Sequence, residues 1–93
     1  MENQHRKISG YRELSQAEID LMNEVKALGP TIEAVVLKVQ AHVLKQRGET
    51  VIPSPEFDRL EAATPERFAA LAKTDFQTAL MCLTRAVAQP TFF

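Results

Sequence analysis

Apolar side chains recur at intervals of three and four residues along the first half of the chain, a spacing that places them on one face of an α-helix. The stripe consists of Ile19, Met22, Ile32, Val36, Val39 and Val43, with Lys26 and Gly29 standing on it. A second stripe beside it consists of Leu21, Val25, Leu28 and Val35. The pattern predicts a long helix over residues 15–46 with a wide apolar face.

A specific capping motif indicates where this helix starts. Ser15 followed by Glu18 forms a capping box, in which each side chain accepts a hydrogen bond from the other residue's backbone N–H. The polar residues 1–14 before it are typical of an arm rather than of a helix. Gly29 and Pro30 fall mid-helix, and because proline removes a backbone bond and crowds the preceding turn, they predict a kink or a break and restart.

Two further helix starts follow, each with a capping residue, a proline at the first helical position and an acid in the first turn: Ser54-Pro55-Glu56 and Thr64-Pro65-Glu66. They predict a short helix over 54–62 and a last helix over 64–89, which stops before Pro90. Nothing in the spacing indicates strands. The chain is therefore predicted to be all-α, a helical hairpin of two long helices with a short connecting helix.

The last helix is apolar almost all round between residues 79 and 88, ALMCLTRAVA, where Arg85 is the only charge. A helix of this kind must be covered on every side. One long and one short partner helix cover two of its sides, so the hairpin is expected to complete its core as a symmetric homo-oligomer.

Composition narrows the class of protein. At 93 residues, 45% hydrophobic and 25% charged, the chain is expected to be one globular domain over 1–93. A net charge of −1 argues against a protein that binds duplex DNA or RNA. Cys82, the single cysteine, suits a reducing compartment, and no signal peptide or membrane-spanning run is present. We expect a cytoplasmic protein.

Catalytic and metal chemistry are not indicated. His5, His42 and Cys82 lack the spacing of metal ligands, and no nucleophile motif occurs. The glycines are scattered singly, so they form no phosphate-binding loop. We expect neither an enzyme nor a bound cofactor or metal.

The chemistry that remains favours an anionic, base-containing ligand. Tyr11 offers an aromatic face for a base and Arg12 a planar cation, while Lys26 stands as a cation on an apolar stripe. Arg12 has an alternative role as a salt-bridge partner of Glu13 or of a neighbouring protomer. For Lys26 the alternative is a stem that packs while its ammonium reaches solvent.

A second set of polar residues lies early in the last helix. Arg67, Thr74 and Gln77 are seven and three residues apart, so they share one helical face. This face is either a solvated surface or, if repeated around a symmetry axis, a ring of hydrogen-bond donors.

Residues 5–29, HRKISGYRELSQAEIDLMNEVKALG, and residues 72–90, AKTDFQTALMCLTRAVAQP, resemble the phage anti-CBASS sponge proteins that bind cyclic oligonucleotides. The first run carries the motif Y-R-x-L-[ST]-x-x-E-I-x-L-M-N-x-[IV]-K, from Tyr11 to Lys26. A related hairpin occurs in phage anti-Thoeris sponges. The resemblance covers both ends of the chain and about half of its length.

The resemblance implies a homohexamer that sequesters cyclic dinucleotides, such as cyclic GMP-AMP, without cleaving them, so that CBASS effectors are not activated. It implies that Tyr11 stacks on a base and Lys26 meets phosphate, with Arg12 as a further contact. It also implies a separate pocket for cyclic trinucleotides near a threefold axis, to which Arg67 and Thr74 are assigned. The alternative is a non-enzymatic helical interaction protein whose arm binds a protein partner.

Overall fold

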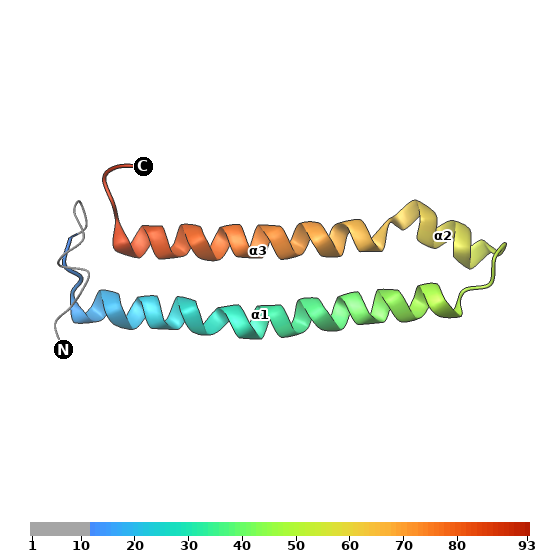
Figure 1. The fold of residues 1–93 in the computed structure, drawn as a ribbon, viewed down its shortest axis with the longest axis horizontal. Helices are drawn as coiled ribbons and strands as arrows, with labels where there is room; N and C mark the ends of the chain where they lie inside the picture. Colours follow the sequence, from blue (N-terminus) through green and yellow to red (C-terminus); the bar gives the residue numbers. More distant parts are fainter. Residues whose placement is uncertain (1–11) are drawn as a thin grey trace.

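The computed structural model describes residues 12–93, and all regular secondary structure in that range is helical. Helix α1 (Gln16–Glu49) and helix α3 (Pro65–Ala88) run antiparallel, side by side, and the short helix α2 (Pro55–Ala63) lies at the turn between them (Figure 1). The C-terminus and the start of α1 lie at the opposite end from α2. The all-α prediction is therefore confirmed for the described part of the chain.

The capping box at the start of α1 is present as predicted. The Ser15 hydroxyl oxygen accepts from the Glu18 N–H at 3.2 Å, and the Glu18 carboxylate accepts from the Ser15 N–H at 2.8 Å. Two backbone donors that lack helical partners are thereby satisfied. Helix α1 starts at the next residue, Gln16.

Helix α1 continues through Pro30 in one piece, so the predicted break and restart does not occur. Proline deprives the Lys26 carbonyl of its helical donor. It also disfavours the helical conformation of the preceding residue, through a clash that involves that residue's Cβ. The preceding residue here is Gly29, which has no Cβ, and this allows the helix to pass the proline.

The far end of α1 lies three residues beyond the expected end at Gln46. The Thr50 hydroxyl donates to the Gln46 carbonyl at 2.5 Å, which satisfies one acceptor of the last turn. Arg47 donates to Glu61 at 2.6 Å and to Glu66 at 2.5 and 3.1 Å. These contacts, chiefly those with Glu66, raise the pKa of Arg47. The last turn of α1 is thus tied to both α2 and α3.

The two predicted capping residues of the later helices behave differently. The Ser54 hydroxyl accepts from the Phe57 N–H at 3.0 Å and caps α2. Thr64 makes no side-chain cap on α3, contrary to the expectation from its sequence signature. Its backbone is left-handed, with φ of 45°, because Thr64 ends α2: its N–H donates to the Leu60 carbonyl at 3.0 Å.

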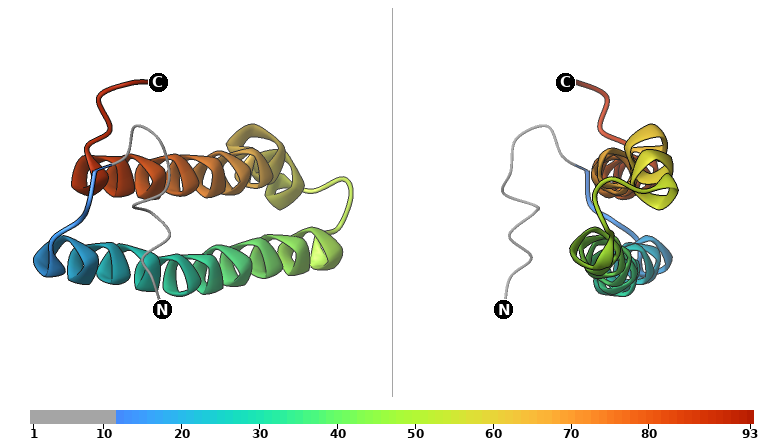
Figure 2. Two further views of the ribbon diagram at one scale, coloured as in Figure 1. Left: turned by 60° about the vertical axis from the view of Figure 1, so that its left-hand side comes forward. Right: turned by 90° about the vertical axis from the view of Figure 1, so that its right-hand side faces the viewer.

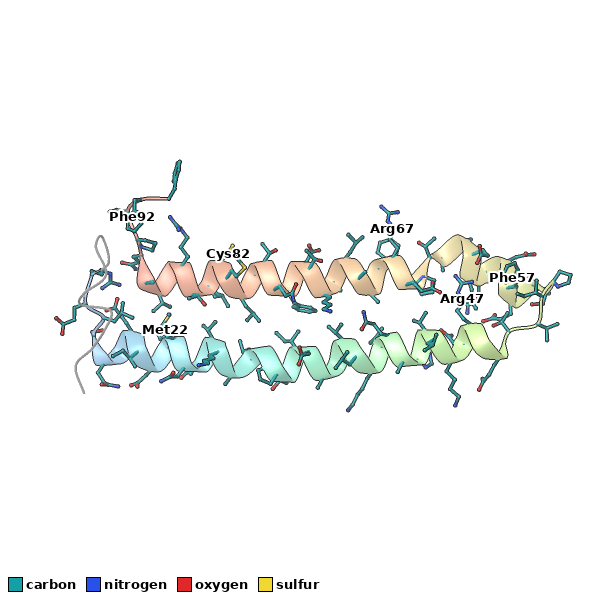
Figure 3. All side chains as sticks on the ribbon, in the orientation of Figure 1. Met22, Arg47, Phe57, Arg67, Cys82 and Phe92 are labelled. Carbon is teal, nitrogen blue, oxygen red and sulfur yellow. The ribbon has the colours of Figure 1, made fainter. Side chains whose placement is uncertain are left out.

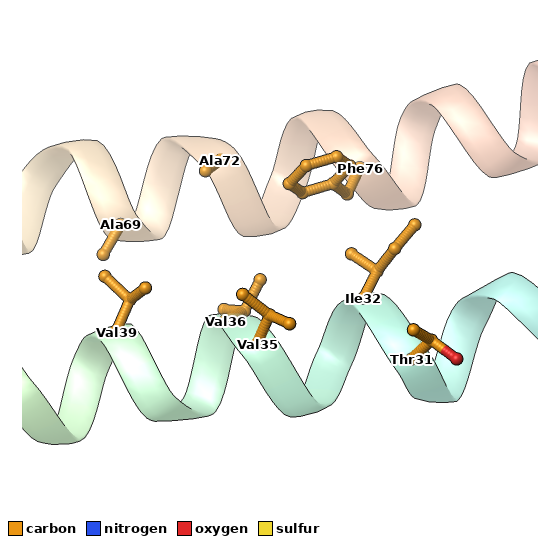
Figure 4. Close-up of a pocket in the computed structure, with 8 residues that line it drawn as sticks. All are labelled: Thr31, Ile32, Val35, Val36, Val39, Ala69, Ala72 and Phe76. Atoms are coloured by element: carbon orange, nitrogen blue, oxygen red, sulfur yellow. The ribbon is translucent and has the colours of Figure 1, made fainter.

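The seam between the long helices is thin. Among the described residues, the buried apolar side chains are Val36 and Val43 of α1, Ala69 of α3 and Leu60 of the short helix α2. Midway along, side chains of α1 and α3 face each other across an apolar cavity of about 310 Å³ (Figure 4). It is lined by Thr31, Ile32, Val35, Val36, Val39, Ala69, Ala72 and Phe76.

A layer of two helices leaves much apolar surface uncovered. Viewed along its length, the described chain shows α1 and α3 as a single pair, with α2 at the turn (Figure 2). Leu44 is 75% exposed and Met81 is 71% exposed. Exposed large apolar side chains lie on both long helices: Leu28, Val35 and Leu37 on α1, and Leu71, Phe76 and Leu83 on α3.

Candidate functional site

A groove of about 690 Å³ runs between α1 and α3 in the half of the hairpin nearest the C-terminus. Its described lining consists of Met22, Asn23, Val25, Lys26, Gly29, Leu80, Met81, Thr84, Arg85, Ala88 and Pro90. Two of these side chains are cationic and none is acidic. Apolar walls with a few polar groups and one sign of charge suit an anionic ligand that also carries apolar rings.

Lys26 contributes one of the two cations from the α1 wall. Among residues 12–93 it has no carboxylate within salt-bridge distance, and the same holds for Arg85. Three arginines outside the groove lining are each paired with glutamates: Arg12, Arg47 and Arg59. The groove therefore holds cations whose charge no described acid neutralises.

Gly29 keeps part of the α1 wall open. A Cβ placed on this residue would meet no atom within 4 Å, so packing within the chain does not require glycine here. The missing side chain lets α1 pass Pro30, and it also leaves room for a ligand to approach the backbone beside Lys26. Gly29 thus permits both the passage of α1 through Pro30 and an open surface beside Lys26.

Arg12 closes the end of the groove by joining three segments. Its Nε donates to the Ala88 carbonyl at 3.0 Å and its Nη2 to the Val87 carbonyl at 2.8 Å. These carbonyls belong to the last turn of α3, where no helical N–H is available to them. Nη1 donates to Glu18 Oε1 at 3.0 Å, and Nη2 contacts the other Glu18 oxygen. Arg12 thus caps α3 and ties it to the first turn of α1.

This bonding bears on the predicted ligand contact by Arg12. Most of the guanidinium's donors are engaged with protein acceptors, and the carboxylate that pairs with it is Glu18. Because Ala88 also lines the groove, Arg12 holds one of its walls. In this structure Arg12 therefore supports the groove from outside its lining.

The ion pair shifts the ionisation of both partners. Hydrogen bonding from Arg12, helped by the Ser15 N–H, lowers the pKa of Glu18 from 4.5 to about 2. The same hydrogen bond raises the pKa of Arg12. Glu18 is thus ionised over the physiological range while it serves both the capping box and the arginine.

The other predicted site residues are placed differently. Tyr11 lies outside the described residues; it directly precedes Arg12 in the chain. Arg67 and Thr74 are exposed on α3 and do not line the groove. Arg67 lies far along the hairpin from Met22, towards α2 (Figure 3), with its guanidinium carbon 5.9 Å from the centre of the Phe68 ring. The dinucleotide and trinucleotide sets therefore occupy separate regions.

The sequence predictions missed Arg85 as a groove residue. The signal was available, since Arg85 is the only charge in the apolar run 79–88. Arg85 is exposed and has no carboxylate partner among residues 12–93, so its charge is open to an anionic ligand.

Fold and groove together define a class: a helical hairpin with an acid-free, cation-lined groove near the end where its arm begins. A model of the family described as Acb2/Tad1, hairpin domain, matches residues 5–88. The chain is also 45% identical to Anti-CBASS protein 2 of Pseudomonas phage JBD67, with 97% of each chain covered. The chain belongs to the Acb2/Tad1 hairpin domain family.

The Glu18 carboxylate gives a pH-dependent prediction. Its pKa is about 2 in the folded chain against an ordinary 4.5, so its stabilising contribution is complete above 4.5 and is lost as the pH falls towards 2. We expect Glu18→Gln to lower the melting temperature at pH 7 and to reduce the loss of stability between pH 4.5 and 2. Thermal unfolding followed by circular dichroism across this range measures both effects.

The matched control is Glu24→Gln, which removes an exposed α1 glutamate that has no arginine partner in the described chain. It should leave the melting temperature at pH 7 within the small range of ordinary surface substitutions. Equal acid sensitivity of the unmodified protein and Glu18→Gln would show that the Arg12–Glu18 pair does not stabilise the fold.

Proposed function

We propose that this chain is a phage anti-defence protein that binds and sequesters cyclic dinucleotides, such as cyclic GMP-AMP, without cleaving them. The observation that carries the proposal is the unneutralised Lys26 in an acid-free groove, in a chain of the Acb2/Tad1 hairpin family. The relative named Anti-CBASS protein 2 supports a role against CBASS signalling. In this role the protein acts in the host cytoplasm and withholds the signal from CBASS effectors.

The ligand's chemistry matches the residues. A cyclic dinucleotide carries two phosphates and two bases, so a site for it needs a cation for each phosphate and an aromatic face for each base. Lys26 meets phosphate by charge-assisted hydrogen bonding, and Tyr11 stacks on a base. A twofold interface between protomers supplies each residue twice, in matching positions.

A homohexamer completes the structure. Large apolar side chains exposed along α1 and α3 favour association of the hairpin with further copies. The assembly brings copies of Lys26 and Tyr11 together and holds the pocket preformed.

Sequestration requires no turnover. A sponge works by stoichiometric capture, so it must bind tightly at low signal concentration; nanomolar affinity corresponds to about −12 kcal/mol. Such affinity is favoured by a site that is ordered before the ligand arrives. The Arg12 contacts with Glu18 and α3 provide that order beside Tyr11.

A second site for cyclic trinucleotides is part of the proposal. Arg67 and Thr74 are two helical turns apart and exposed on α3, and neither lines the groove. Repeated about a threefold axis, Arg67 offers one guanidinium for each of three phosphates. Thr74 adds a hydroxyl that can donate or accept.

Dinucleotide binding is tested by isothermal titration with cyclic GMP-AMP. We expect Lys26→Ala to weaken binding by at least about 100-fold, since a twofold site loses both copies of a charge-assisted contact worth about 1.5–3 kcal/mol. Tyr11→Ala should cost about 1–3 kcal/mol for each stacked base. Chromatography after denaturation should recover the ligand intact.

Lys38→Ala is the control for charge, because it removes an exposed α1 lysine outside the groove. It should bind as the unmodified protein does. Absence of binding to any cyclic oligonucleotide would refute the proposal and favour an interaction protein with a protein partner. Recovery of hydrolysed ligand would instead identify an enzyme.

Assembly is tested by light scattering coupled to size exclusion. Six copies of the 10.4 kDa chain have a mass of about 62 kDa. Leu83→Glu, which places a charge on the exposed apolar surface of α3, should shift the population to smaller species. A stable 10.4 kDa species of the unmodified chain at micromolar concentration contradicts the assembly.

The trinucleotide site is tested with cyclic tri-adenylate. It should bind protein already saturated with cyclic GMP-AMP, because the two sites are separate. Arg67→Ala should abolish this binding while leaving cyclic GMP-AMP bound, and Lys26→Ala should do the reverse. Competition between the two ligands would contradict separate sites.

A further inference from the structure

Arg85 is the second cation of the groove, and no role has been given to it so far. It lies on α3, on the wall opposite the α1 residues Lys26 and Gly29, and lines the groove together with Thr84 and Ala88. Its position near the end of α3 places it beside the carbonyl groups that Arg12 caps. Arg85 is therefore built into the same half of the hairpin as the proposed dinucleotide site.

The hydrogen bond of Arg85 orients the side chain without neutralising it. Nη2 donates to the Phe92 carbonyl at 2.8 Å, across the turn that follows α3. This turn is made by Gln89, whose left-handed backbone, with φ of 54°, ends the helix. The partner carbonyl carries no net charge, and Nε and Nη1 make no hydrogen bond to a described residue. Arg85 is thus held in place with its charge and part of its donor set available.

Three other arginines differ from Arg85, because each of them is paired with a carboxylate. Arg12, Arg47 and Arg59 each contact at least one glutamate, and each thereby serves the fold. Arg85 has no such partner among residues 12–93, and no acid lines its groove. An uncompensated guanidinium in a partly apolar groove gains most from a phosphate, whose oxygens match its planar fork.

We propose that Arg85 donates hydrogen bonds to a phosphate of the bound cyclic dinucleotide and forms, with Lys26, a two-cation phosphate site. The inference rests on the proposed function of this groove. The two side chains are not equivalent: Lys26 supplies a compact charge, whereas Arg85 supplies directed donors that fix the phosphate's orientation. Arg85 thus supplies a ligand contact from α3, on the wall opposite Lys26.

The experiment is titration of cyclic GMP-AMP into the unmodified protein and the variants Arg85→Ala, Arg85→Gln and Arg85→Lys, at several salt concentrations. Glutamine keeps an N–H donor but has no charge. We expect about 10- to 100-fold weaker binding by Arg85→Ala and Arg85→Gln, with Arg85→Lys in between. Loss of the cation should also make the affinity less sensitive to salt.

The outcomes separate the inference from the function it rests on. Lys38→Ala serves as the control for a lost surface charge, and light scattering checks that each variant keeps the assembly of the unmodified protein. If all three Arg85 variants bind within twofold of the unmodified protein while Lys26→Ala does not bind, Arg85 is not a ligand contact and the proposed function stands. If Arg85→Gln binds normally, the charge of Arg85 is not needed for binding, and the inference fails. Absence of binding by the unmodified protein removes both.

Discussion

An arginine at each end of the hairpin joins the two long helices, and the arrangement of the rest depends on these contacts. Arg12 connects the start of α1 to the last turn of α3, and Arg47 connects the end of α1 to α2 and the start of α3. Between them the seam holds few buried side chains and an apolar cavity. Neither arginine is deeply buried, so each pair alone stabilises modestly; their value lies in fixing which ends meet.

Because the seam between α1 and α3 buries few side chains, the hairpin does not form a complete hydrophobic core by itself. Each long helix carries apolar residues over more of its circumference than one partner covers, and the exposed set includes Leu28, Val35 and Leu83. Burial of such surface is the main favourable term in association. In the proposed homohexamer, neighbouring copies cover this apolar surface.

Much of the fold could be predicted from local signals, whereas its long-range contacts could not. The capping box at Ser15 and the proline-led starts at Ser54 and Thr64 are short-range patterns, and the helices begin next to them. Of the two outcomes expected at Pro30, a kink or a break and restart, the break does not occur, because α1 continues through the proline. The end of α1 was placed too early because Arg47 is held by residues 14 and 19 positions away.

For the candidate site, too, local patterns in the sequence were informative and long-range contacts could not be predicted. Lys26 was predicted from its place on an apolar stripe and does line the groove. Arg12 was predicted as a ligand contact by residue type; it also donates to two carbonyls about 75 residues away at the end of α3, contacts that no local pattern indicates. Arg67 and Thr74 were assigned by resemblance and shared face, and their role depends on symmetry that a single chain does not contain.

The distinction between structural and ligand-binding cations follows from their partners. A guanidinium that contacts a carboxylate has its charge compensated and adds to the fold, whereas an exposed cation without a carboxylate partner keeps donors that an anion can use. Arg12, Arg47 and Arg59 belong to the first kind, and Lys26 and Arg85 to the second. Four of the twelve acids, Glu18, Glu56, Glu61 and Glu66, pair with the structural arginines, and no acid belongs to the described lining of the groove, so a nearly neutral chain still presents cations there.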